Sequence, residues 1–256
     1  LTNKKKIGFI PTMGCLHDGH VSLIRKSKKK KLLTIVSIFV NPLQFNNKKD
    51  YKKYPKTIST DLRICKKNKV DYVYLPQEND IYPEKKIVTK NKIHFFNNYM
   101  EGKFRPGHFE GVIEVVKRLL SHIKTTYLFL GKKDYQQLII IKKYLESIKS
   151  KIKVVPCDTI RAKNGIALSS RNKLLDQKSL NIAGKIISFL KKNKNQIIKS
   201  NRNIFFIKKI KEFGAKKIDY LSAFNLKKLK KTNKPSVNTR VFLAYYLNNV
   251  RLIDNF

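Results

Sequence analysis

Residues 7–30, with the sequence IGFIPTMGCLHDGHVSLIRKSKKK, contain the pattern that sets the architecture of the chain. Residues 7–10 are apolar and have the length of a buried strand, and residues 21–30 have the spacing of an amphipathic helix. The loop between them holds two glycines and two histidines. A strand followed by a loop and a helix is the repeating unit of proteins in which helices connect parallel strands.

The same alternation of short apolar runs and longer amphipathic stretches continues to about residue 160. Further strands are predicted at 33–40, 72–75, 127–130 and 152–155, and further helices at 58–67, 111–121 and 135–148. Continuous apolar strands separated by helices predict a parallel sheet covered on both faces. Ligands bind such sheets at the carboxyl ends of the strands, so the chemistry is expected just after residues 10, 40, 130 and 155.

The pattern changes after about residue 160. Two lysine-rich helices are predicted near 177–194 and 203–213, then strands at 218–224, 241–247 and 250–253, with a turn at Asn248-Asn249 between the last two. The stretch 191–203 is predicted to be a helix end followed by a loop. These elements predict a small α+β second domain, so that the chain would divide into domains 1–159 and 160–256.

The composition predicts a folded protein with a strongly basic surface. Of the 256 residues 41% are hydrophobic, which is enough for one or two packed domains. The formal net charge is +40, which alone would favour a nucleic acid or an anionic membrane as the partner. Only nine of the 57 basic residues are arginines, however, and the lysines are spread along the chain. A solvated surface produced by A/T-rich codon drift is therefore favoured over a dedicated nucleic-acid-binding face.

Cysteine usage and the absence of a targeting pattern indicate a cytoplasmic protein. Cys15, Cys65 and Cys157 are odd in number and far apart, so they form neither a disulfide framework nor a CxxC motif. No run approaches the roughly 18 apolar residues of a membrane span, and the lysine-rich start leads directly into a strand. The first residue is Leu1 and not Met, which suggests an incomplete or unusually initiated N-terminus.

The loop at residues 11–20 favours a nucleotide as the ligand. Its two glycines have the spacing of a phosphate-binding GxxxxG loop, but His20 stands where such a loop needs Lys, so a P-loop is not indicated. His17 and His20 lie at the start of a helix, where free main-chain N–H groups already favour a polyphosphate. Their imidazoles can donate to phosphate oxygens that gain charge as pyrophosphate leaves. Two solvated histidines are the alternative, and a zinc site would need further ligands that the loop lacks.

Six segments resemble the pantothenate synthetase (pantoate–β-alanine ligase) family, which belongs to the class I nucleotidyltransferase superfamily with its HxGH signature. They are 11–20 (PTMGCLHDGH), 36–45 (VSIFVNPLQF), 105–112 (RPGHFEGV), 131–137 (GKKDYQQ), 167–172 (ALSSRN) and 251–255 (RLIDN). The resemblance implies a Rossmann-like N-terminal domain, with helices on both faces of a parallel sheet, and a C-terminal lid domain. It also implies a cytoplasmic, homodimeric ligase that uses ATP and Mg²⁺ to join pantoate to β-alanine through pantoyl adenylate.

The resemblance also implies a role for each candidate site residue, with His20 as the catalytic residue. The implied ATP-binding residues are Met13, Gly14, Cys15, Leu16, His17, Asp18, Gly19, His20, Gly131, Lys132, Lys133, Asp134, Ile160, Leu168, Ser169, Ser170 and Arg171. The implied pantoate-binding residues are Gln44, Gln137, Val112, Val115 and Val116, with Gln44 also near β-alanine. In this scheme Lys133 binds triphosphate oxygens and Asp134 a ribose hydroxyl or a main-chain N–H. The segment 169–171 grips the β- and γ-phosphates as a lid closes.

Simpler interpretations of several of these residues stay open. A glutamine at a helix start is usually solvated, the three valines also suit an ordinary core, and Ser169-Ser170 also suits a plain turn. Asp61 is the one candidate ligand for Mg²⁺, and a surface carboxylate at a helix start is its simpler interpretation. Lys132 stands where the family usually has Glu, which adds a positive charge beside the pair formed by Lys133 and Asp134.

Two other functions compete with the ligase. A related nucleotidyltransferase would transfer a nucleotide to a phosphate acceptor, and its acceptor pocket should be basic. Gln44, Gln137 and the valines are neutral instead. A basic RNA- or DNA-binding protein would show a one-sided basic face or an RNP-type aromatic motif, and the sequence displays neither. Small-molecule substrates, with no specific nucleic acid and no membrane, are therefore the expected partners.

Overall fold

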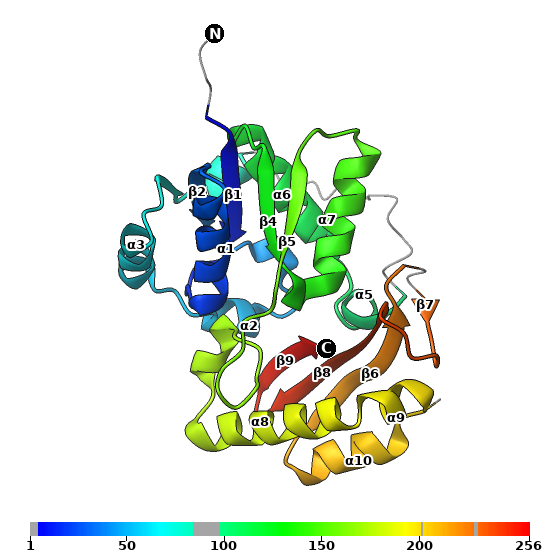
Figure 1. Cartoon of the computed structure of the whole chain (residues 1–256). Coiled ribbons are helices and arrows are strands. Elements are labelled where there is room, and N and C mark those ends of the chain that lie inside the picture. Colours follow the sequence, from blue (N-terminus) through cyan, green and yellow to red (C-terminus); the bar gives the residue numbers. More distant parts are fainter. Residues whose placement is uncertain (1–4, 84–97, 201, 228–229) are drawn as a thin grey trace. The chain divides into compact units, whose positions relative to one another are not determined.

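The computed structural model of the chain describes residues 5–83, 98–200, 202–227 and 230–256 (Figure 1). The chain divides into two compact units, Leu1–Ile160 and Arg161–Phe256, which we call the first and the second unit. Each unit has a sheet of its own. Among the described residues, no helix combines the length and the apolar character needed to cross a membrane.

The first unit is built on a five-stranded parallel sheet with the order β3-β2-β1-β4-β5. The strands are β1 (Ile7–Thr12), β2 (Leu33–Ile38), β3 (Tyr72–Tyr74), β4 (Tyr127–Gly131) and β5 (Lys153–Cys157). The chain runs outward from β1 to β3 and then returns to β4 on the other side of β1. The carboxyl ends of β1 and β4 therefore lie at the switch point of the sheet, where ligands of such folds bind. The predicted parallel sheet is confirmed.

Nine helical segments connect and cover these strands within the described part of the first unit. They are α1 (Asp18–Lys29), η1 (Pro42–Gln44), α2 (Lys48–Lys53), α3 (Ile58–Lys67), α4 (Glu78–Ile81), α5 (Met100–Phe104), α6 (His108–His122), η3 (Lys132–Asp134) and α7 (Tyr135–Ser147). Two apolar clusters separate the helices from the sheet. Phe9 of β1 belongs to the cluster that contains α6 and α7 residues, and the next residue, Ile10, belongs to the cluster with α1 and α3 residues. Both faces of the sheet are thus covered, as predicted.

The main differences from the sequence prediction in this unit are at helix starts. Helix α1 begins at Asp18, three residues earlier than predicted, because the His17 side chain caps it. Helix α6 also begins three residues earlier, at His108, after Gly107 with φ 78°. The short helices α2, α4 and α5 were not predicted, because segments of four to six residues give no readable periodicity.

The second unit is a four-stranded antiparallel sheet with the order β7-β6-β8-β9 and helices. Its elements are η4 (Ser170–Leu174), α8 (Gln177–Lys192), α9 (Lys194–Lys199), α10 (Ile204–Glu212), β6 (Lys217–Asn225), β7 (Lys230–Lys231), β8 (Thr239–Leu247) and β9 (Val250–Asn255). Leu247 pairs with Val250 across the predicted Asn248-Asn249 turn, and Asn248 takes φ 51°. The predicted α+β second domain is confirmed.

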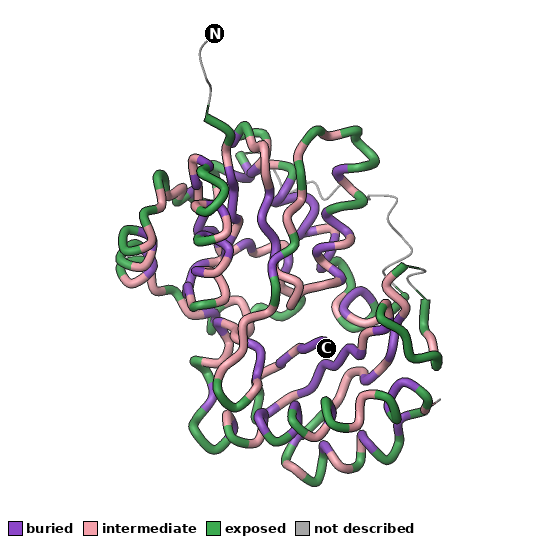
Figure 2. The backbone as a smooth tube through the Cα atoms, in the orientation of Figure 1, coloured by how far each residue is buried: buried purple, intermediate pink, exposed green. Residues whose placement is uncertain are grey.

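One prediction in the second unit is wrong. The stretch 191–203 is not only a helix end and a loop, because α9 occupies part of it. Ile197 and Ile198 are 0% and 2% exposed and join the core formed by α8, α10, β6 and β8. Two buried isoleucines among lysines and asparagines are too few to show a helical period in the sequence. Figure 2 shows the buried residues of the chain concentrated in the strands and on the inner faces of the helices.

An ion pair fixes the first residues of the second unit. Arg161 donates from Nη1 and Nη2 to the two carboxylate oxygens of Asp254 at 2.7 and 2.8 Å. It also donates to the main-chain oxygens of Gly165 and Asn255 at 2.9 and 3.0 Å. Because Asp254 is 4% exposed on β9, this bidentate pair attaches residues 161–165 to the sheet of the second unit.

Candidate active site

The loop after β1 is held by the carboxylate of Asp61. Asp61 lies in the first turn of α3 and is 1% exposed. Its Oδ2 accepts the main-chain N–H of Cys15 at 2.9 Å, and its Oδ1 accepts that of Leu16 at 2.7 Å. A carboxylate buried against two main-chain N–H groups fixes the path of the loop.

The same loop needs glycine at its sharpest bend. Gly14 has φ 75° and Cys15 has φ 50°, so two successive residues adopt the left-handed conformation. A Cβ atom on Gly14 would lie 2.9 Å from Cγ2 of Ile38 and 3.0 Å from Oδ2 of Asp61. Glycine therefore allows the loop to turn close to β2 and α3 and to present the residues that follow at the end of β1.

The two histidines lie together at the N-terminus of α1. Nδ1 of His17 accepts the main-chain N–H of Gly19 at 3.1 Å, and Nδ1 of His20 accepts the main-chain N–H of His17 at 3.3 Å. The ring centroids are 4.2 Å apart. Because each Nδ1 accepts a hydrogen bond, the proton of each neutral ring is on Nε2. The helix start thus offers two imidazole N–H donors beside its own main-chain N–H groups.

The charge state of His20 follows from its surroundings. Burial lowers its pKa to about 3, and the electrostatic effects of His17 and Lys133 act in the same direction. His20 is therefore neutral at physiological pH, and it can donate a proton from Nε2 in a hydrogen bond without carrying a charge. Lys133 therefore lies near enough to His20 to influence its charge.

Lysine and aspartate side chains follow β4 at the other side of the switch point. Nζ of Lys133 lies 3.3 Å from Oδ1 of Asp134, and Nζ of Lys132 lies 2.6 Å from Oδ1 of Asp158. Asp134 makes no side-chain cap on α7. Lys132 and Lys133 thus lie in the short helix η3 at the carboxyl edge of the sheet, each paired with a carboxylate.

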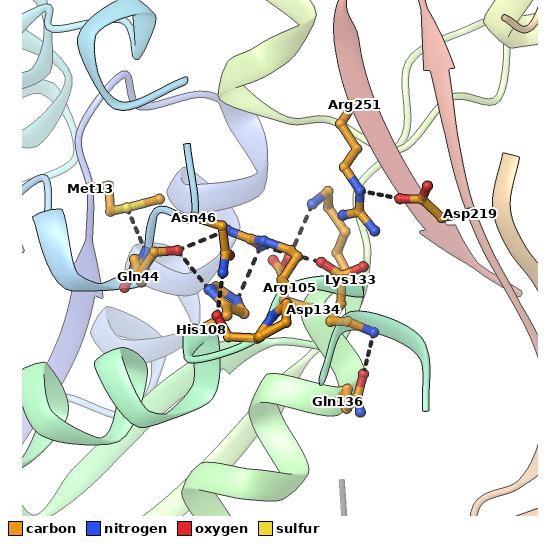
Figure 3. Close-up of polar contacts among 12 residues, drawn as sticks. Met13, Gln44, Asn46, Arg105, His108, Lys133, Asp134, Gln136, Asp219 and Arg251 are labelled. Atoms are coloured by element: carbon orange, nitrogen blue, oxygen red, sulfur yellow. Dashed lines mark hydrogen bonds and ion pairs between the residues drawn. The ribbon is translucent and has the colours of Figure 1, made fainter. Parts of the chain in front are cut away.

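Gln44 ends η1 after β2 and is 8% exposed. Its Oε1 accepts from Nδ2 of Asn41 at 3.2 Å, and its Nε2 contacts the sulfur of Met13 at 2.7 Å. The amide therefore lies against the loop that follows β1 (Figure 3). The structure brings this predicted pantoate residue close to a predicted ATP-binding residue.

A charged clamp holds the main chain at Gln44. The carbonyl oxygen of Gln44 accepts from Nη2 of Arg105 and from Nδ1 of His108, both at 2.9 Å (Figure 3). Arg105 Nη1 also lies 3.1 Å from His108 Nε2 and 3.2 Å from Oε2 of Glu101. His108 and Glu101 are 5% and 6% exposed. Residues of the 105–112 segment thus fix the position of the η1 turn.

Helix α6 also approaches η1 closely at Gly111. A Cβ atom on Gly111 would lie 2.3 Å from the carbonyl oxygen of Leu43 and 3.0 Å from the main-chain nitrogen of Gln44. Both contacts are to main-chain atoms, which cannot rotate away. Glycine at this position allows η1 to pack directly on the helix.

The two neighbouring glutamines of α7 have different surroundings. Gln136 is 5% exposed, accepts the main-chain N–H of Glu101 at 2.9 Å and donates to the carbonyl of Tyr99 at 3.0 Å. It therefore attaches α5 to α7. Gln137 is half-buried at the helix start, and its amide makes no hydrogen bond with any described residue. Of the two, Gln137 has the amide that can bind a ligand.

The three valines belong to the core. Val112, Val115 and Val116 are 2%, 7% and 5% exposed on α6 and pack in the cluster that contains Phe9 and Leu128. Their interpretation as ordinary core is therefore correct. A role as one wall of a pantoate pocket stays a prediction.

The predicted lid residues belong to the second unit. Oγ of Ser169 accepts the main-chain N–H of Arg171 at 3.3 Å, and Oδ1 of Asn172 accepts the main-chain N–H of Ser169 at 2.6 Å. Ser169 thus caps the short helix η4, and Ser170 is buried. Leu168 and Arg171 are half-buried, and Ile160 is the last residue of the first unit.

The prediction of Asp61 as a magnesium ligand gains no support from the geometry. Both of its oxygens accept main-chain N–H groups, and Thr57 donates to Oδ1 at 3.2 Å. Its interpretation as a surface carboxylate is wrong, because it is buried. Within the described ranges no group of three His, Cys, Asp or Glu side chains is placed to hold a metal ion.

Four residues around Gln44 were not predicted as part of the site: Asn41, Tyr82, Arg105 and His108. Three of them lie in segments that carry the family resemblance, so their place in a motif was the available signal. Tyr82 lies outside those segments, and only the fold reveals its contact with Asn41.

A parallel α/β sheet with paired histidines in the loop after its first strand is the arrangement of a nucleotidyltransferase-like enzyme. The family model described as pantoate-beta-alanine ligase matches residues 1–256. The chain belongs to the pantoate-beta-alanine ligase family.

Named relatives and solved structures agree with this membership. The chain is 42% identical over 256 residues to the pantothenate synthetase of Francisella tularensis subsp. novicida strain U112, covering 100% of this chain and 91% of the relative. A crystal structure of pantoate-beta-alanine ligase from Francisella tularensis, complexed with beta-gamma ATP and beta-alanine, matches with a TM-score of 0.85 and 41% identity, covering 100% of this chain and 91% of that one. Pantothenate synthetase from Thermus thermophilus matches with a TM-score of 0.87 and 30% identity, over 98% and 93% of the two chains.

Proposed function

We propose that this ATP-dependent pantoate–β-alanine ligase works in two steps, through an enzyme-bound pantoyl adenylate. The observation that supports this proposal most directly is the pair of histidines at the start of α1, together with the neutral amide of Gln44, which contacts Met13 of the loop that leads to them. The histidines suit a polyphosphate, and the amide suits a hydroxy acid. A phosphate acceptor would instead require a basic pocket beside the loop.

In the first step a pantoate carboxylate oxygen attacks the α-phosphorus of ATP. A new P–O bond forms, and the bond to the bridging oxygen of pyrophosphate breaks. The protein has to position two anions and stabilise the charge on the departing pyrophosphate, so no nucleophilic side chain is needed. We assign this stabilisation to Nε2 of His17 and His20 and to Nζ of Lys133, because they gather at one edge of the sheet.

In the second step the amine of β-alanine attacks the acyl carbon of pantoyl adenylate. The C–N bond forms, and AMP leaves with the oxygen that pantoate contributed in the first step. The amine loses a proton as the amide forms. Gln44 and Gln137 are proposed to hold the pantoyl group during both steps, since neutral amides bind hydroxyl and carboxylate oxygens without trapping a charged product.

The remaining nucleotide contacts are proposed from the family resemblance. Residues 13–20 would surround the triphosphate, Asp134 would bind the ribose, and Ser169, Ser170 and Arg171 would bind the β- and γ-phosphates. The cap that Ser169 forms on η4 supports this assignment, because it fixes the start of the turn that carries Arg171. Mg²⁺ enters as part of the MgATP substrate, with phosphate oxygens as its main ligands.

An isotope experiment tests the adenylate. Pantoate labelled with ¹⁸O in its carboxylate should transfer one labelled oxygen to AMP during pantothenate formation, as read by mass spectrometry. Omission of β-alanine should still give pyrophosphate in an amount that does not exceed the enzyme. A label found in inorganic phosphate, with ADP as the nucleotide product, would show an acyl-phosphate route and contradict the proposal.

The cytoplasmic location, the homodimer and the absence of a specific nucleic-acid partner stay predictions. Sedimentation of the purified chain at several concentrations would test the dimer. Its binding to unrelated duplexes at increasing salt would test the role of the +40 charge.

A further inference from the structure

We propose that Tyr82 is a positioning residue that acts through Asn41 to turn the N–H group of Gln44, and not its carbonyl oxygen, toward the substrate. The inference rests on the proposed role of Gln44 in pantoate binding. It assigns a function to a residue outside the six segments that carry the family resemblance, and it specifies the chemistry of the group that Gln44 can bind.

Asn41 is the centre of this arrangement and is 1% exposed. Its Oδ1 accepts from the hydroxyl of Tyr82 at 2.8 Å and from the main-chain N–H of Leu43 at 3.2 Å. Its Nδ2 donates to the carbonyl of Gly111 at 3.0 Å and to Oε1 of Gln44 at 3.2 Å. Two donors face the oxygen and two acceptors face the nitrogen. A flipped Asn41 amide would place like groups together at both ends, so the network selects one orientation.

This orientation determines which atom of Gln44 remains for a ligand. Oε1 of Gln44 is already bonded to Asn41, so the N–H groups of Nε2 point elsewhere. In the structure Nε2 contacts the thioether sulfur of Met13. A thioether is a weak acceptor, and a substrate oxygen in its place would form a stronger hydrogen bond. The partner of Gln44 is therefore an acceptor, such as the carboxylate or the activated acyl oxygen of pantoate, and not the ammonium group of β-alanine.

The hydroxyl of Tyr82 makes the shortest of the four hydrogen bonds to Asn41. Tyr82 itself is 5% exposed, and its ring is held from one side by Arg118, whose Cζ lies 5.1 Å from the ring centroid. Arg118 is fixed in turn by Glu114 at 2.6 Å and by the carbonyl of Ile81 at 2.9 Å. Removal of the hydroxyl alone should thus leave the ring in place.

The hydroxyl is also a permanent donor. Burial raises the pKa of Tyr82 far above its usual range, and the negative charge of Glu114 acts in the same direction. The proton therefore stays on the oxygen over the whole pH range in which the enzyme can be assayed.

The first test is a double-mutant cycle on pantoate affinity, measured by calorimetry. Tyr82→Phe should weaken pantoate binding about five- to tenfold in the parent chain and less than about twofold in a Gln44→Ala background, because the effect passes through Gln44. ATP affinity and the melting temperature should change little in either background. Tyr74→Phe is the matched control. It removes the hydroxyl of a tyrosine on β3, which bonds to Nδ1 of His122 at 2.7 Å, and it should leave pantoate affinity unchanged.

A second pair of variants tests the direction of the Gln44 amide. Aspartate at position 41 can only accept, so it should attract the N–H groups of Gln44 and turn its carbonyl toward the substrate. Asn41→Asp should therefore weaken pantoate binding more than Asn41→Ala, although aspartate has nearly the shape of asparagine. A purely structural role for Asn41 predicts instead that ATP affinity and the melting temperature fall together with pantoate affinity in both variants.

Equal losses for Tyr82→Phe in both backgrounds, or no loss in the parent, would overturn the inference and leave the proposed function intact. A parent chain that binds ATP but no pantoate would overturn the proposed function, and the inference with it. Melting temperatures of all variants show whether each one is folded.

Discussion

Nδ1 of His20 accepts the main-chain N–H of His17 at 3.3 Å, so the side chain of the second histidine is oriented by the backbone of the first. The bond fixes the tautomer of His20 and directs its Nε2–H away from the helix. The spacing of the two histidines therefore determines how the second ring is oriented. Gly19 between them leaves room for the ring of His17, because a Cβ atom at position 19 would lie 2.6 Å from that ring.

His20→Ala should slow adenylate formation about a hundredfold while the fold persists, because it removes a donor that strengthens as pyrophosphate gains charge. The measurement is single-turnover formation of pantoyl adenylate by rapid quench. His20→Gln, which keeps a side-chain N–H, should lose less activity than alanine. An unchanged single-turnover rate in His20→Ala would remove His20 from the mechanism.

His20 should also make stability depend on pH. Its pKa is about 3 in the folded chain and about 6.5 in an unfolded chain, so the unfolded chain binds more protons at acidic pH. The contribution of His20 to stability is complete above pH 6.5 and is lost as the pH falls toward 3. Urea unfolding between pH 7.5 and 4 should thus show that the parent loses more stability than His20→Gln, which has no proton to gain. Parallel pH profiles of the two chains would contradict the neutral histidine.

Asp61→Asn should destabilise the first unit by about 2 kcal/mol, because an amide offers one acceptor to the two N–H groups of Cys15 and Leu16. ATP affinity should fall with it, since the loop would lose its path. Thermal unfolding and ATP calorimetry would measure the two effects. Recovery of ATP affinity at high Mg²⁺ concentration would instead favour the metal-ligand role.

The two adjacent glutamines allow a matched comparison. Gln137→Leu should weaken pantoate binding about tenfold with little change in ATP affinity or melting temperature, because it removes an amide from the substrate. Gln136→Leu should lower the melting temperature instead, because it removes the bonds to Glu101 and Tyr99. If Gln136→Leu weakened pantoate binding and Gln137→Leu lowered the melting temperature, Gln136 and not Gln137 would be the residue that binds the substrate.

Arg171→Ala should weaken ATP more than pantoate, since the guanidinium is proposed to bind only the phosphates. Calorimetry with each ligand alone separates the two affinities. Lys173→Ala is the control, because it removes an exposed cation from the same turn. Equal effects of the two substitutions on ATP would indicate a nonspecific loss of charge.

The parts of the fold that could be predicted are the helices with a periodic apolar pattern and the strands with a continuous apolar run. The bounds predicted for α3 coincide with the observed Ile58–Lys67, and each strand of the first sheet was found within a few residues, because continuous apolar runs have few alternatives. Contacts between distant residues have no such signal. The burial of Asp61 depends on N–H groups 45 and 46 positions away, and the role of Tyr82 depends on a side chain 41 positions away. Position in a motif makes Gln44 a candidate, but only packing reveals the hydrogen bonds that join Gln44, Asn41 and Tyr82.

The close packing of Gly111 against η1 has a consequence for how this sequence can change over time. Substitutions to lysine on the outer faces of helices alter the charge of the chain and leave its interior unchanged. A codon bias toward lysine can therefore act at these exposed positions with little loss of stability. Even alanine at position 111 would bring a methyl group to 2.3 Å from the carbonyl of Leu43 and push the turn that carries Gln44. The outer surface of this protein should therefore accept many substitutions, whereas at Gly111 even one additional carbon atom would clash with the main chain.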